Sequence, residues 1–481
     1  MIGNAARERL RSEVVVIGSG PGGATAAHIL AEHGKQVLIL EEGPHLPLES
    51  CPPFSIQEMA QKYRAGGLNP TFGNARIAFV EACCAGGGSE INSGLYHRTP
   101  PEVLDQWRRD FDLLQTSSDD LLPHFKYNED ALQVGVCPDG APAASMKMAE
   151  GAAQLGWRAM EVPRWFKYDV AKPAAHSTGT RQSMTKTYIP RALKAGAQLM
   201  PLTRALRLRR SGRGWSVTAV RGGRTIDIQA DTVFMAAGAV QTPVLLRRSG
   251  IRKNVGNTLA LHPTVKVVAL FDEVVNHEDL GVPVHQVKEF SPRIGMGCSI
   301  SSPPHLALAL SGYKRFEVEL KANWRRMASY YAMITGPNTG RIRPVFSARD
   351  PIIRYSLNGA DLRDLAHGMR RLCTLLLRAG AIRVYPSISG AHYITKEEEL
   401  SRIPGSLSPD RSNLMTIHLF ASCPMGENEA RCAVNSVGRV HGIPDLYICD
   451  ASILCTAPGV NPQGSIMALA RRNVLRFLDE L

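Results

Sequence analysis

The stretch EVVVIGSGPGGATAAHILAEHGKQVLILEEG, residues 13–43, decides the fold of this 481-residue chain. Its apolar run at residues 14–17 is short and β-branched, as expected of a buried parallel strand. A G-x-G-x-x-G turn follows, then small and apolar residues at helical spacing over residues 24–33, then a second apolar strand at residues 37–40. Strand, glycine-rich turn, helix and strand in this order predict a dinucleotide-binding α/β unit.

Three glycines and one carboxylate give this unit its expected chemistry. Gly18 allows the tight turn, Gly20 lets the backbone approach a pyrophosphate, and Gly23 lets helix and strand pack closely. The helix N-terminus offers unpaired N–H groups and its positive dipole end to the phosphates. Glu41 stands where a carboxylate accepts hydrogen bonds from an adenosine ribose. The pattern leaves open which dinucleotide binds and for what chemistry.

Length and composition indicate a globular protein with more than one core. A chain of 481 residues predicts two connected domains. A hydrophobic content of 44% with 21% charged residues excludes the disordered and fibrous classes. The formal net charge is +13, but the basic residues are scattered. Because a basic stripe and a recognition motif are both missing, we expect no nucleic-acid partner.

Cysteine usage and the N-terminus both point to the cytoplasm. The ten cysteines include no CxxC pair and no His/Cys spacing suited to zinc, so we expect reduced thiols and no metal site. The N-terminal residues lack the apolar core of a signal peptide, and no run of apolar residues is long enough to span a membrane.

Two further glycine-rich stretches predict backbone that meets a flat ligand. Residues 86–94 read GGGSEINSG, and three consecutive glycines suit a chain lying against a ligand face. Residues 231–238 form an apolar strand ending in Gly238, where a helix begins. Between residues 199 and 220 the hydrophobic period is two, which predicts a β-meander.

The last seventy residues carry the remaining polar candidates. His418 precedes a small-residue turn, and a strand over residues 446–449 ends in Asp450. Asn461 and Pro462 then precede a final helix over residues 463–481, with Asn461 suited to the N-cap and Pro462 to the first helical position. The positive end of this helix should therefore lie beside Asn461.

Taken together, these stretches resemble the glucose–methanol–choline (GMC) family of flavin-dependent oxidoreductases over nearly the whole chain. In order, the resemblance is carried by the fingerprint with Glu41, GGGSEIN at residues 86–92, GAVQTPVLLRRSGI at residues 238–251, and the block from His418 to Pro462. It implies an α/β fold, α+β overall, with a Rossmann-like FAD-binding domain intertwined with a substrate domain built on an antiparallel sheet.

The resemblance also implies the division of the chain between these domains. The FAD-binding domain is discontinuous and takes residues 1–130, 195–275 and 405–481. The substrate-binding or cap domain takes residues 131–194 and 276–404.

A cofactor and a reaction follow from the same resemblance. FAD is expected without a covalent link, because Asn92 rather than a histidine follows Ile91. His418 is implied as the base that takes the hydroxyl proton of an alcohol, and Asn461 as its partner at the substrate oxygen. The residues expected to contact or cradle FAD are Gly18, Gly20, Gly23, Glu41, Gly87, Ser89, Asn92, Ala205, Gly238, Asp450, Ala451 and Pro462.

The implied substrate is a small-molecule alcohol, oxidised to an aldehyde or ketone and, for a hydrated aldehyde, on to an acid. The compact chain is similar to bacterial oxidases of sugar or aminoglycoside hydroxymethyl groups in antibiotic biosynthesis, such as paromamine 6'-oxidase. The positive net charge opposes a polycationic substrate unless carboxylates compensate locally. Glu317 and Glu319, predicted to alternate on a strand, are the candidates for that role or for a solvated face.

Several alternatives stay open at this point. A sterol or long-chain alcohol oxidase shares the Asn461 block. A flavoprotein monooxygenase or amine oxidase shares the N-terminal fingerprint, and a flavin-binding protein without turnover belongs to another class. His262 is predicted to be structural, capping a turn near the cofactor. Oxygen or another acceptor could reoxidise the flavin, and the oligomeric state is open.

Overall fold

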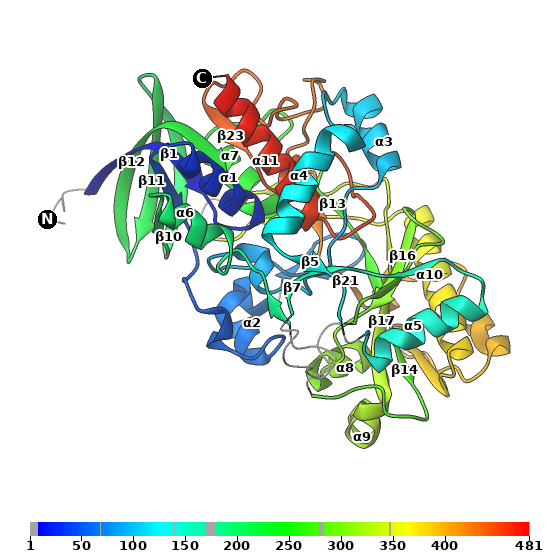
Figure 1. Cartoon of the computed structure of the whole chain (residues 1–481). Helices are drawn as coiled ribbons and strands as arrows, with labels where there is room; N and C mark the ends of the chain where they lie inside the picture. Colours follow the sequence, from blue (N-terminus) through cyan, green and yellow to red (C-terminus); the bar gives the residue numbers. More distant parts are fainter. Residues whose placement is uncertain are drawn as a thin grey trace, which may run out of the picture.

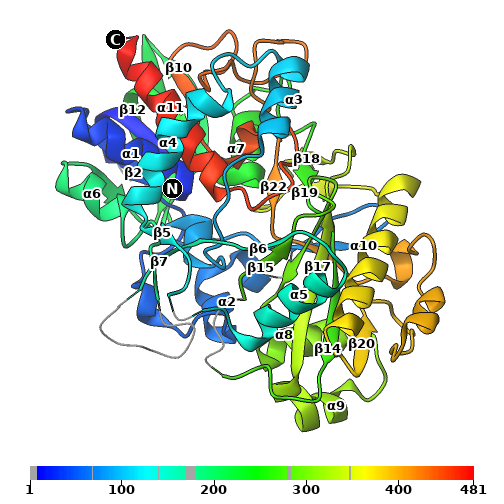
Figure 2. The same cartoon turned by 45° about the vertical axis from the view of Figure 1, so that its right-hand side comes forward.

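Two large sheets organise the chain, each with helices on its faces (Figures 1 and 2). The structure is a computed structural model that describes residues 8–67, 69–138, 140–168, 179–278, 283–345 and 348–480. The N-terminal and C-terminal stretches meet in one lobe, and the middle of the chain builds most of the other.

The first sheet contains the predicted dinucleotide-binding unit. Its strand order is β10-β11-β12-β1-β2-β9, with β23 also paired to β12. The pairs around β1 are parallel, and β10, β11 and β12 form the predicted antiparallel meander. The strands are β1 (Glu8–Ile17), β2 (Val37–Leu40), β9 (Gln198–Met200), β10 (Thr203–Ser211), β11 (Gly214–Arg221), β12 (Arg224–Met235) and β23 (Leu446–Ile448).

Burial on both faces explains the continuous apolar run in β1. Val14 and Val16 pack into the core beneath α1 and α11, whereas Val15 and Ile17 pack into the core on the opposite face. The helices of this lobe are α1 (Pro21–Glu32), α3 (Pro101–Phe111), α4 (Ser118–Ala131), α6 (Tyr188–Lys194), α7 (Gly238–Arg248) and α11 (Gln463–Asp479).

The second sheet is mainly antiparallel, as predicted for the substrate-binding part. Its strand order is β3-β4-β21-β14-β17-β16-β15-β6, with β20 also paired to β14. The strands are β3 (Asn69–Pro70), β4 (Ile77–Phe79), β6 (Ala159–Glu161), β14 (Thr264–Leu270), β15 (His285–Val287), β16 (Ile294–Cys298), β17 (Met327–Ile334), β20 (Arg383–Pro386) and β21 (Leu414–Thr416).

Alternate residues of β14 face two different sets of helices. Val265 and Val267 belong to the core that includes α5 and α10, whereas Val268 and Leu270 belong to the cluster under α8. The remaining helices are α2 (Ile56–Lys62), α5 (Ala143–Gln154), α8 (Pro303–Leu310), α9 (Phe316–Asn323) and α10 (Gly359–Arg378).

Three small sheets complete the fold. The pair β13 with β22 is antiparallel and joins residues that are far apart in the sequence. The others are β18 with β19 and the three-stranded β5-β7-β8. Their bounds are β5 (Val134–Gly135), β7 (Arg164–Lys167), β8 (Thr180–Arg181), β13 (Ala260–Leu261), β18 (Arg341–Arg343), β19 (Ile352–Arg354) and β22 (Leu419–Phe420).

The division of the chain into two domains stays a prediction; the second sheet takes β3, β4, β14 and β21 from the residue ranges expected for the FAD-binding domain. One sequence-based expectation differs from this architecture. The strand predicted around Glu317 and Glu319 was wrong, because these residues lie in α9. Phe316, Leu320 and Trp324 recur at helical spacing and pack against the α8 cluster, so the helical period prevails over the alternation of the glutamates.

Candidate active site

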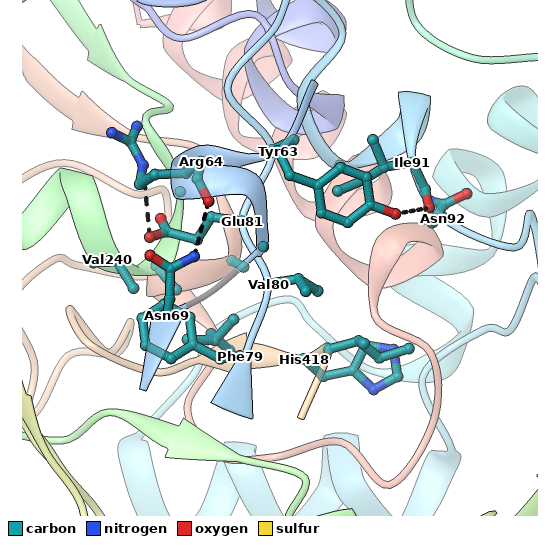
Figure 3. Close-up of a pocket in the computed structure, with 18 of the residues that line it drawn as sticks. Tyr63, Arg64, Asn69, Phe79, Val80, Glu81, Ile91, Asn92, Val240 and His418 are labelled. Atoms are coloured by element: carbon teal, nitrogen blue, oxygen red, sulfur yellow. Dashed lines mark hydrogen bonds and ion pairs between the residues drawn. The ribbon is translucent and has the colours of Figure 1, made fainter. Parts of the chain in front are cut away.

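A cavity of about 1420 Å³ is lined by residues of both sheets. Its wall combines the fingerprint turn, the glycine loop that starts at Gly86, the starts of α7 and α11, and the strands β14 and β17. Figure 3 shows part of this wall, with His418 below Tyr63 and Asn92 in that view. The volume exceeds the roughly 300–1,000 Å³ of sites for single drug-sized ligands, so a dinucleotide and a second molecule fit together.

The fingerprint glycines are places where backbone touches backbone. Gly18 has a φ of +104°, and a Cβ there would lie 2.2 Å from the carbonyl oxygen of Ala236. A Cβ on Gly23 would lie 2.1 Å from the oxygen of Gly18, which matches its expected packing role. Gly18 and Gly20 line the cavity, whereas Gly23 is buried behind them.

Gly22 is a fourth required glycine that the motif alone did not single out. A Cβ on Gly22 would lie 1.7 Å from the carbonyl oxygen of Cys449, at the end of β23. Helix α1 therefore packs against the last strand of the sheet as closely as its backbone allows. The N–H groups of its first turn face the cavity, where they can bind phosphate.

Glu41 lines the cavity at the end of β2, as expected. One carboxylate oxygen accepts hydrogen bonds from the backbone N–H and the hydroxyl of Ser19, at 3.1 and 2.6 Å. The other accepts from the N–H of Gly43 at 2.8 Å. Burial raises the pKa of Glu41 although these bonds oppose the shift. Glu41 thus holds the phosphate turn in place, and one accepting position remains for a ribose hydroxyl.

Asp450 is buried at the end of β23, and its carboxylate accepts four hydrogen bonds from the protein. The donors are the N–H of Gly238 at 2.8 Å, the hydroxyl of Thr242 at 2.5 Å, and the N–H and hydroxyl of Ser452 at 2.8 and 2.5 Å. The side chain therefore ties the start of α7 to the turn at Ala451. The expected contact of Asp450 with FAD is left to its backbone.

The glycine loop lies against the fingerprint turn. The N–H of Gly86 donates to the hydroxyl of Ser19 at 3.2 Å, and Gly87 packs on Gly20. Ser89 differs from its expected place, because it is fully buried beneath the loop, where its hydroxyl donates to the oxygen of Gly86 and accepts from the N–H of Met184. Gly87 itself lines the cavity.

Asn92, Ala205, Ala451 and Pro462 all line the cavity. The amide of Asn92 donates to Gln463 at 2.7 Å and accepts from the N–H of Gly94, so it joins the loop to the start of α11. Ala205 lies at a register shift in β10, next to the expected adenine position. The expectation that Asn461 caps α11 was wrong: Pro462 is the N-cap, and the side chain of Asn461 turns to His418 instead.

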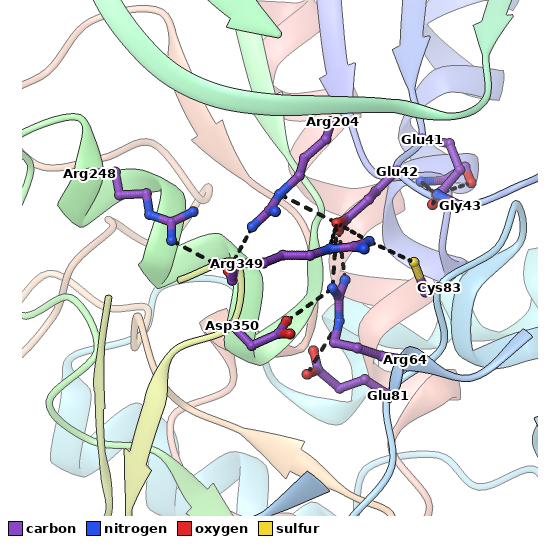
Figure 4. A network of polar contacts seen from close by, with 11 residues as sticks. Glu41, Glu42, Gly43, Arg64, Glu81, Cys83, Arg204, Arg248, Arg349 and Asp350 are labelled. Atoms are coloured by element: carbon purple, nitrogen blue, oxygen red, sulfur yellow. Dashed lines mark hydrogen bonds and ion pairs between the residues drawn. The ribbon is translucent and has the colours of Figure 1, made fainter. Parts of the chain in front are cut away.

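A buried network of charges closes one side of the cavity (Figure 4). Arg64, whose side chain is 7% exposed, donates to Glu42 at 2.7 Å and lies 3.7 Å from Glu81. Glu42 also pairs with Arg204 and Arg349. Burial by itself would raise the pKa of Glu42, but the three arginines hold it at about 2.

At Glu81 burial outweighs the attraction of Arg64, so the stability of the protein should depend on pH. Burial raises its pKa from 4.5 to about 7, and Arg64 offsets only part of the shift. Between these values the folded protein binds the proton more tightly than the unfolded chain, so stability falls as pH rises through this window. We expect the free energy of unfolding of Glu81→Gln, relative to that of wild type, to rise by about 3 kcal/mol when the pH is raised from 4.5 to 8, at 1.36 kcal/mol per pKa unit. Urea unfolding of both proteins at pH 4.5 and pH 8 measures this difference, and an equal difference at the two pH values would contradict the prediction.

His418 and His262 are brought together by the register of β13 and β22. Ala260 pairs with Phe420 and Leu261 with Leu419, so the next residues in register are His262 and His418. Their Nδ1 atoms lie 3.0 Å apart. His262 therefore contacts His418 directly, in addition to the structural role predicted for it.

The hydrogen bonds of His262 fix where the protons lie in this pair. The backbone N–H of Gly459 donates to Nε2 of His262 at 3.1 Å, so neutral His262 carries its proton on Nδ1. That proton is donated to Nδ1 of His418, and neutral His418 then carries its own proton on Nε2. Burial lowers the pKa of His418 to about 4 and that of His262 well below its ordinary value, so both are neutral at pH 7.

A second chain of hydrogen bonds orients Asn461 from the other side. The ammonium of Lys288 donates to Oε1 of Gln286 at 2.6 Å, and Nε2 of Gln286 donates to Oδ1 of Asn461 at 3.2 Å. The NH₂ group of Asn461 is thereby turned toward Nε2 of His418, at 3.4 Å. Lys288 also contacts Nε2 of His97 at 2.9 Å, and burial lowers the pKa of Lys288 to about 8.

The two chains converge on a pair of donors at the cavity wall. Nε2–H of His418 and Nδ2–H of Asn461 face the same space, and neither supplies an acceptor to the other. An oxygen atom of a bound molecule, with its lone pairs, would satisfy both. The arrangement therefore binds and polarises a hydroxyl, alkoxide or carbonyl oxygen.

Sequence reasoning did not single out Gln286, Lys288 or His97, because neither the segment with Gln286 and Lys288 nor the one with His97 carries a local motif. Gln286 and Lys288 come from β15 and the residue after it, more than 170 positions before Asn461. The one signal available was a charged residue inside or beside an apolar strand, which also marks Lys266 in β14.

A dinucleotide cradle that opens onto a histidine–asparagine site defines a flavin-type oxidoreductase. Family models described as GMC oxidoreductase match residues 56–264 and 340–470, and one described as pyridine nucleotide-disulphide oxidoreductase matches residues 12–93. The chain belongs to the GMC oxidoreductase family. It is accordingly an FAD-binding enzyme that acts on alcohol-type donors.

Named relatives span nearly the whole chain. An uncharacterized GMC-type oxidoreductase, y4nJ of Sinorhizobium fredii, is 37% identical over 96% of this chain and 94% of its own. Long-chain-alcohol oxidase FAO3 of Arabidopsis thaliana is 26% identical over 96% of this chain and 67% of its own. The crystal structure of a pyridoxine 4-oxidase shares the fold, with a TM-score of 0.75, 18% identity, and coverage of 97% of this chain and 99% of that one.

The residues present fit FAD. The backbone contacts at Gly18 and Gly22 leave a cradle that side chains would fill, and Glu41 keeps one accepting position for a ribose. Within the described ranges, no group of three or more His, Cys, Asp and Glu residues could hold a metal ion. The same ranges contain no helix with the length and apolarity needed to cross a membrane. Cys298, Cys373 and Cys449 are buried free thiols, as expected of reduced core residues.

Proposed function

We propose that this enzyme oxidises the CH–OH group of a small-molecule alcohol to an aldehyde or ketone, with the substrate oxygen held between His418 and Asn461. The observation that carries the proposal is the pair of donors 3.4 Å apart on the cavity wall, each backed by its own hydrogen-bond chain. An alcohol oxygen gains negative charge as its proton leaves, and preorganised donors stabilise that charge most strongly away from water.

The chain's residues would divide the reaction between them. Bound FAD supplies the acceptor for the hydride that leaves the alcohol carbon. His418 would donate from Nε2 and Asn461 from Nδ2 to the developing alkoxide, and the hydroxyl proton would be released to bulk solvent as the substrate settles between them. His262 holds the tautomer of His418, and the Lys288–Gln286 chain holds the amide of Asn461.

The sequence-based role of His418 as the base is the alternative mechanism. It requires a free lone pair on Nε2, so the proton of His418 would move to Nδ1. His262 would then accept on Nδ1, carry its proton on Nε2, and lose the hydrogen bond from Gly459. The two mechanisms make different predictions for a side chain that can donate a hydrogen bond but cannot accept a proton: it can replace His418 only if His418 acts as a donor.

Non-covalent FAD is supported by the position of Asn92, whose amide is engaged with Gln463 and Gly94. The cofactor's phosphates would meet the first turn of α1 and the backbone at Gly20, Gly87 and Gly238. The start of α11, at Pro462, would place a positive dipole end beside the flavin.

For the substrate, sugar or aminoglycoside hydroxymethyl groups were the sequence-based expectation. Glu317 and Glu319 lie on α9 outside the cavity wall, and Glu319 pairs with Arg383, so they offer no compensation for a polycation. A sterol or long-chain alcohol is favoured instead by the size of the cavity and by the long-chain-alcohol oxidase relatives. The donor pair at His418 argues against a monooxygenase, an amine oxidase or a binding protein without turnover.

Oxygen or another acceptor would reoxidise the flavin, and buried free thiols such as Cys298, Cys373 and Cys449 support a location in the reducing cytoplasm.

Anaerobic flavin bleaching tests the proposal. Purified holoenzyme is mixed with sugars, aminoglycosides, sterols and fatty alcohols, and we expect at least one class to remove the oxidised flavin absorbance. Admission of air then separates an oxidase, whose colour returns within seconds, from an enzyme that needs another acceptor. If no alcohol bleaches the flavin but NADPH does, the monooxygenase alternative replaces the proposal.

A further inference from the structure

The face of β14 that looks into the cavity carries a single cation. Residues alternate along this strand, so Val265 and Val267 pack into the core beneath α10, whereas Thr264 and Lys266 line the cavity. Lys266 lies directly opposite Tyr331 of β17, which lines the same cavity. The lysine is thus part of the wall between the donor pair and α8.

The ammonium of Lys266 has no partner among the described residues. Its backbone is fully engaged with Ser387, whose hydroxyl accepts from the N–H of Lys266 and whose own N–H donates to the carbonyl oxygen. Burial lowers the pKa of Lys266 to about 8, and no described carboxylate opposes that shift. Lys266 is half-buried in the cavity wall, and charges withdrawn from bulk water are normally paired, so this lysine is a cation prepared for a partner from outside the chain.

The other charges of the cavity leave Lys266 unbalanced. Glu41 and Asp450 are engaged at the dinucleotide end. Glu42 and Glu81 face Arg64. Of the remaining charged lining groups, Arg204 pairs with Glu42 and Arg248 donates to the backbone oxygen of Ala348. Asp410 and Arg76 are exposed at the rim and cancel each other in charge.

The path from the donor pair to Lys266 sets the length of a ligand that could touch both. His262 lies beside His418, two residues before β14 begins at Thr264, and at 3.3–3.4 Å per residue the four residues to Lys266 cover up to about 13 Å. A 2-hydroxy acid, whose two functional groups are adjacent, cannot span that distance. A single ammonium without a neighbouring arginine fork suits a singly charged carboxylate better than a phosphate.

We propose that Lys266 binds a carboxylate of the substrate, so that the enzyme oxidises hydroxy acids whose hydroxyl and carboxylate lie at opposite ends of the molecule. The proposal rests on the proposed function, since it assigns the hydroxyl end to His418 and Asn461. It also makes the substrate an anion, in agreement with the net charge of +13.

The test compares matched acids and neutral alcohols. Anaerobic flavin reduction is measured for ω-hydroxy acids from 6-hydroxyhexanoate to 12-hydroxydodecanoate, each paired with the α,ω-diol of the same length. We expect wild type to prefer one or more of the acids over its diol by about 10- to 100-fold in kcat/KM, the effect of one hydrogen bond to a charged group. Lys266→Met should lose that preference, so that acid and diol of equal length react with similar kcat/KM, whereas Lys266→Arg should keep it.

A binding measurement separates this inference from the proposed function. Calorimetric titration of wild type and Lys266→Met with the unreactive fatty acids of the same lengths requires no turnover. Lys321→Met, on exposed α9, removes the same charge outside the cavity and should bind like wild type.

Each pattern of results decides between the two claims. If the fatty acids bind wild type but not Lys266→Met, the inference stands even where no alcohol reduces the flavin, and only the proposed function fails. If alcohols reduce the flavin but acids and diols react equally, or Lys266→Met binds fatty acids as well as wild type, the inference is overturned and the proposed function stands.

Discussion

Replacing His418 by alanine is expected to slow anaerobic flavin reduction by about 10²–10³-fold, the loss that follows removal of one donor from an oxyanion-type site. FAD should remain bound, because its cradle is built from the fingerprint turn, the loop after Gly86 and the start of α7. Stopped-flow absorbance at saturating alcohol measures the rate, and the visible spectrum measures the bound FAD. His124→Ala, which removes a histidine bonded to Arg471 at 2.7 Å away from the cavity wall, is the control and should reduce at the wild-type rate.

His418→Gln then separates the two mechanisms. Glutamine can donate a hydrogen bond from a position close to Nε2, but it cannot take a proton at neutral pH. If His418 acts as a donor, we expect the glutamine variant to recover at least tenfold of the rate lost in alanine. If both variants are equally slow, and wild-type reduction falls as pH drops toward 4, His418 is the base and the tautomer exchange with His262 takes place.

Arg64→Met is expected to destabilise the folded protein by about 3–5 kcal/mol, because it leaves buried carboxylates without their partner. Glu42 loses its hydrogen bond of 2.7 Å. Glu81 loses the charge of Arg64, which is the largest effect that lowers its pKa against burial. With total stabilities of about 5–15 kcal/mol, a loss of this size takes much of the folded population toward unfolding. Urea unfolding at pH 7.5 measures it.

Arg349→Met is the matched control for this prediction. Arg349 contacts the same Glu42 at 2.6 Å, but its side chain is 56% exposed, so its loss should cost less than about 1 kcal/mol. Lowering the pH to 5 should reduce the penalty in Arg64→Met, because Glu81 is then protonated. Equal destabilisation by the two variants would show that burial does not set the strength of this network.

Local sequence predicted the first βαβ unit closely. The strands at residues 14–17 and 37–40, the helix between them and the final helix are all present, because apolar periodicity and glycine placement are properties of the chain itself. The order of the four motifs also predicted the family, which the family models and relatives confirm. The same reasoning failed at Glu317 and Glu319, where the contacts of Phe316 and Leu320 with α8 select a helix.

The active site was predicted only in part. His418 and Asn461 could be named from the sequence, and they do meet at the cavity. Their hydrogen-bond partners His262 and Gln286 were not predicted. Ser89 was expected to line the flavin and lies behind the wall, whereas Gly23 lies behind it in the packing role expected of it. Gly22 was missed because its constraint comes from Cys449, more than four hundred residues away.

By itself, the sequence determined the βαβ unit and the glycine cradle, and it singled out His418 and Asn461, the two residues proposed to hold the substrate oxygen. Only the tertiary structure decided how those residues are protonated and oriented. His262 reaches His418 through the register of β13 and β22, Gln286 reaches Asn461 from β15, and Lys266 faces the cavity because β14 exposes alternate residues there. The physical reason is that a tautomer, an amide orientation and an unpaired charge depend on contacts between strands that are distant in sequence, which no local pattern encodes.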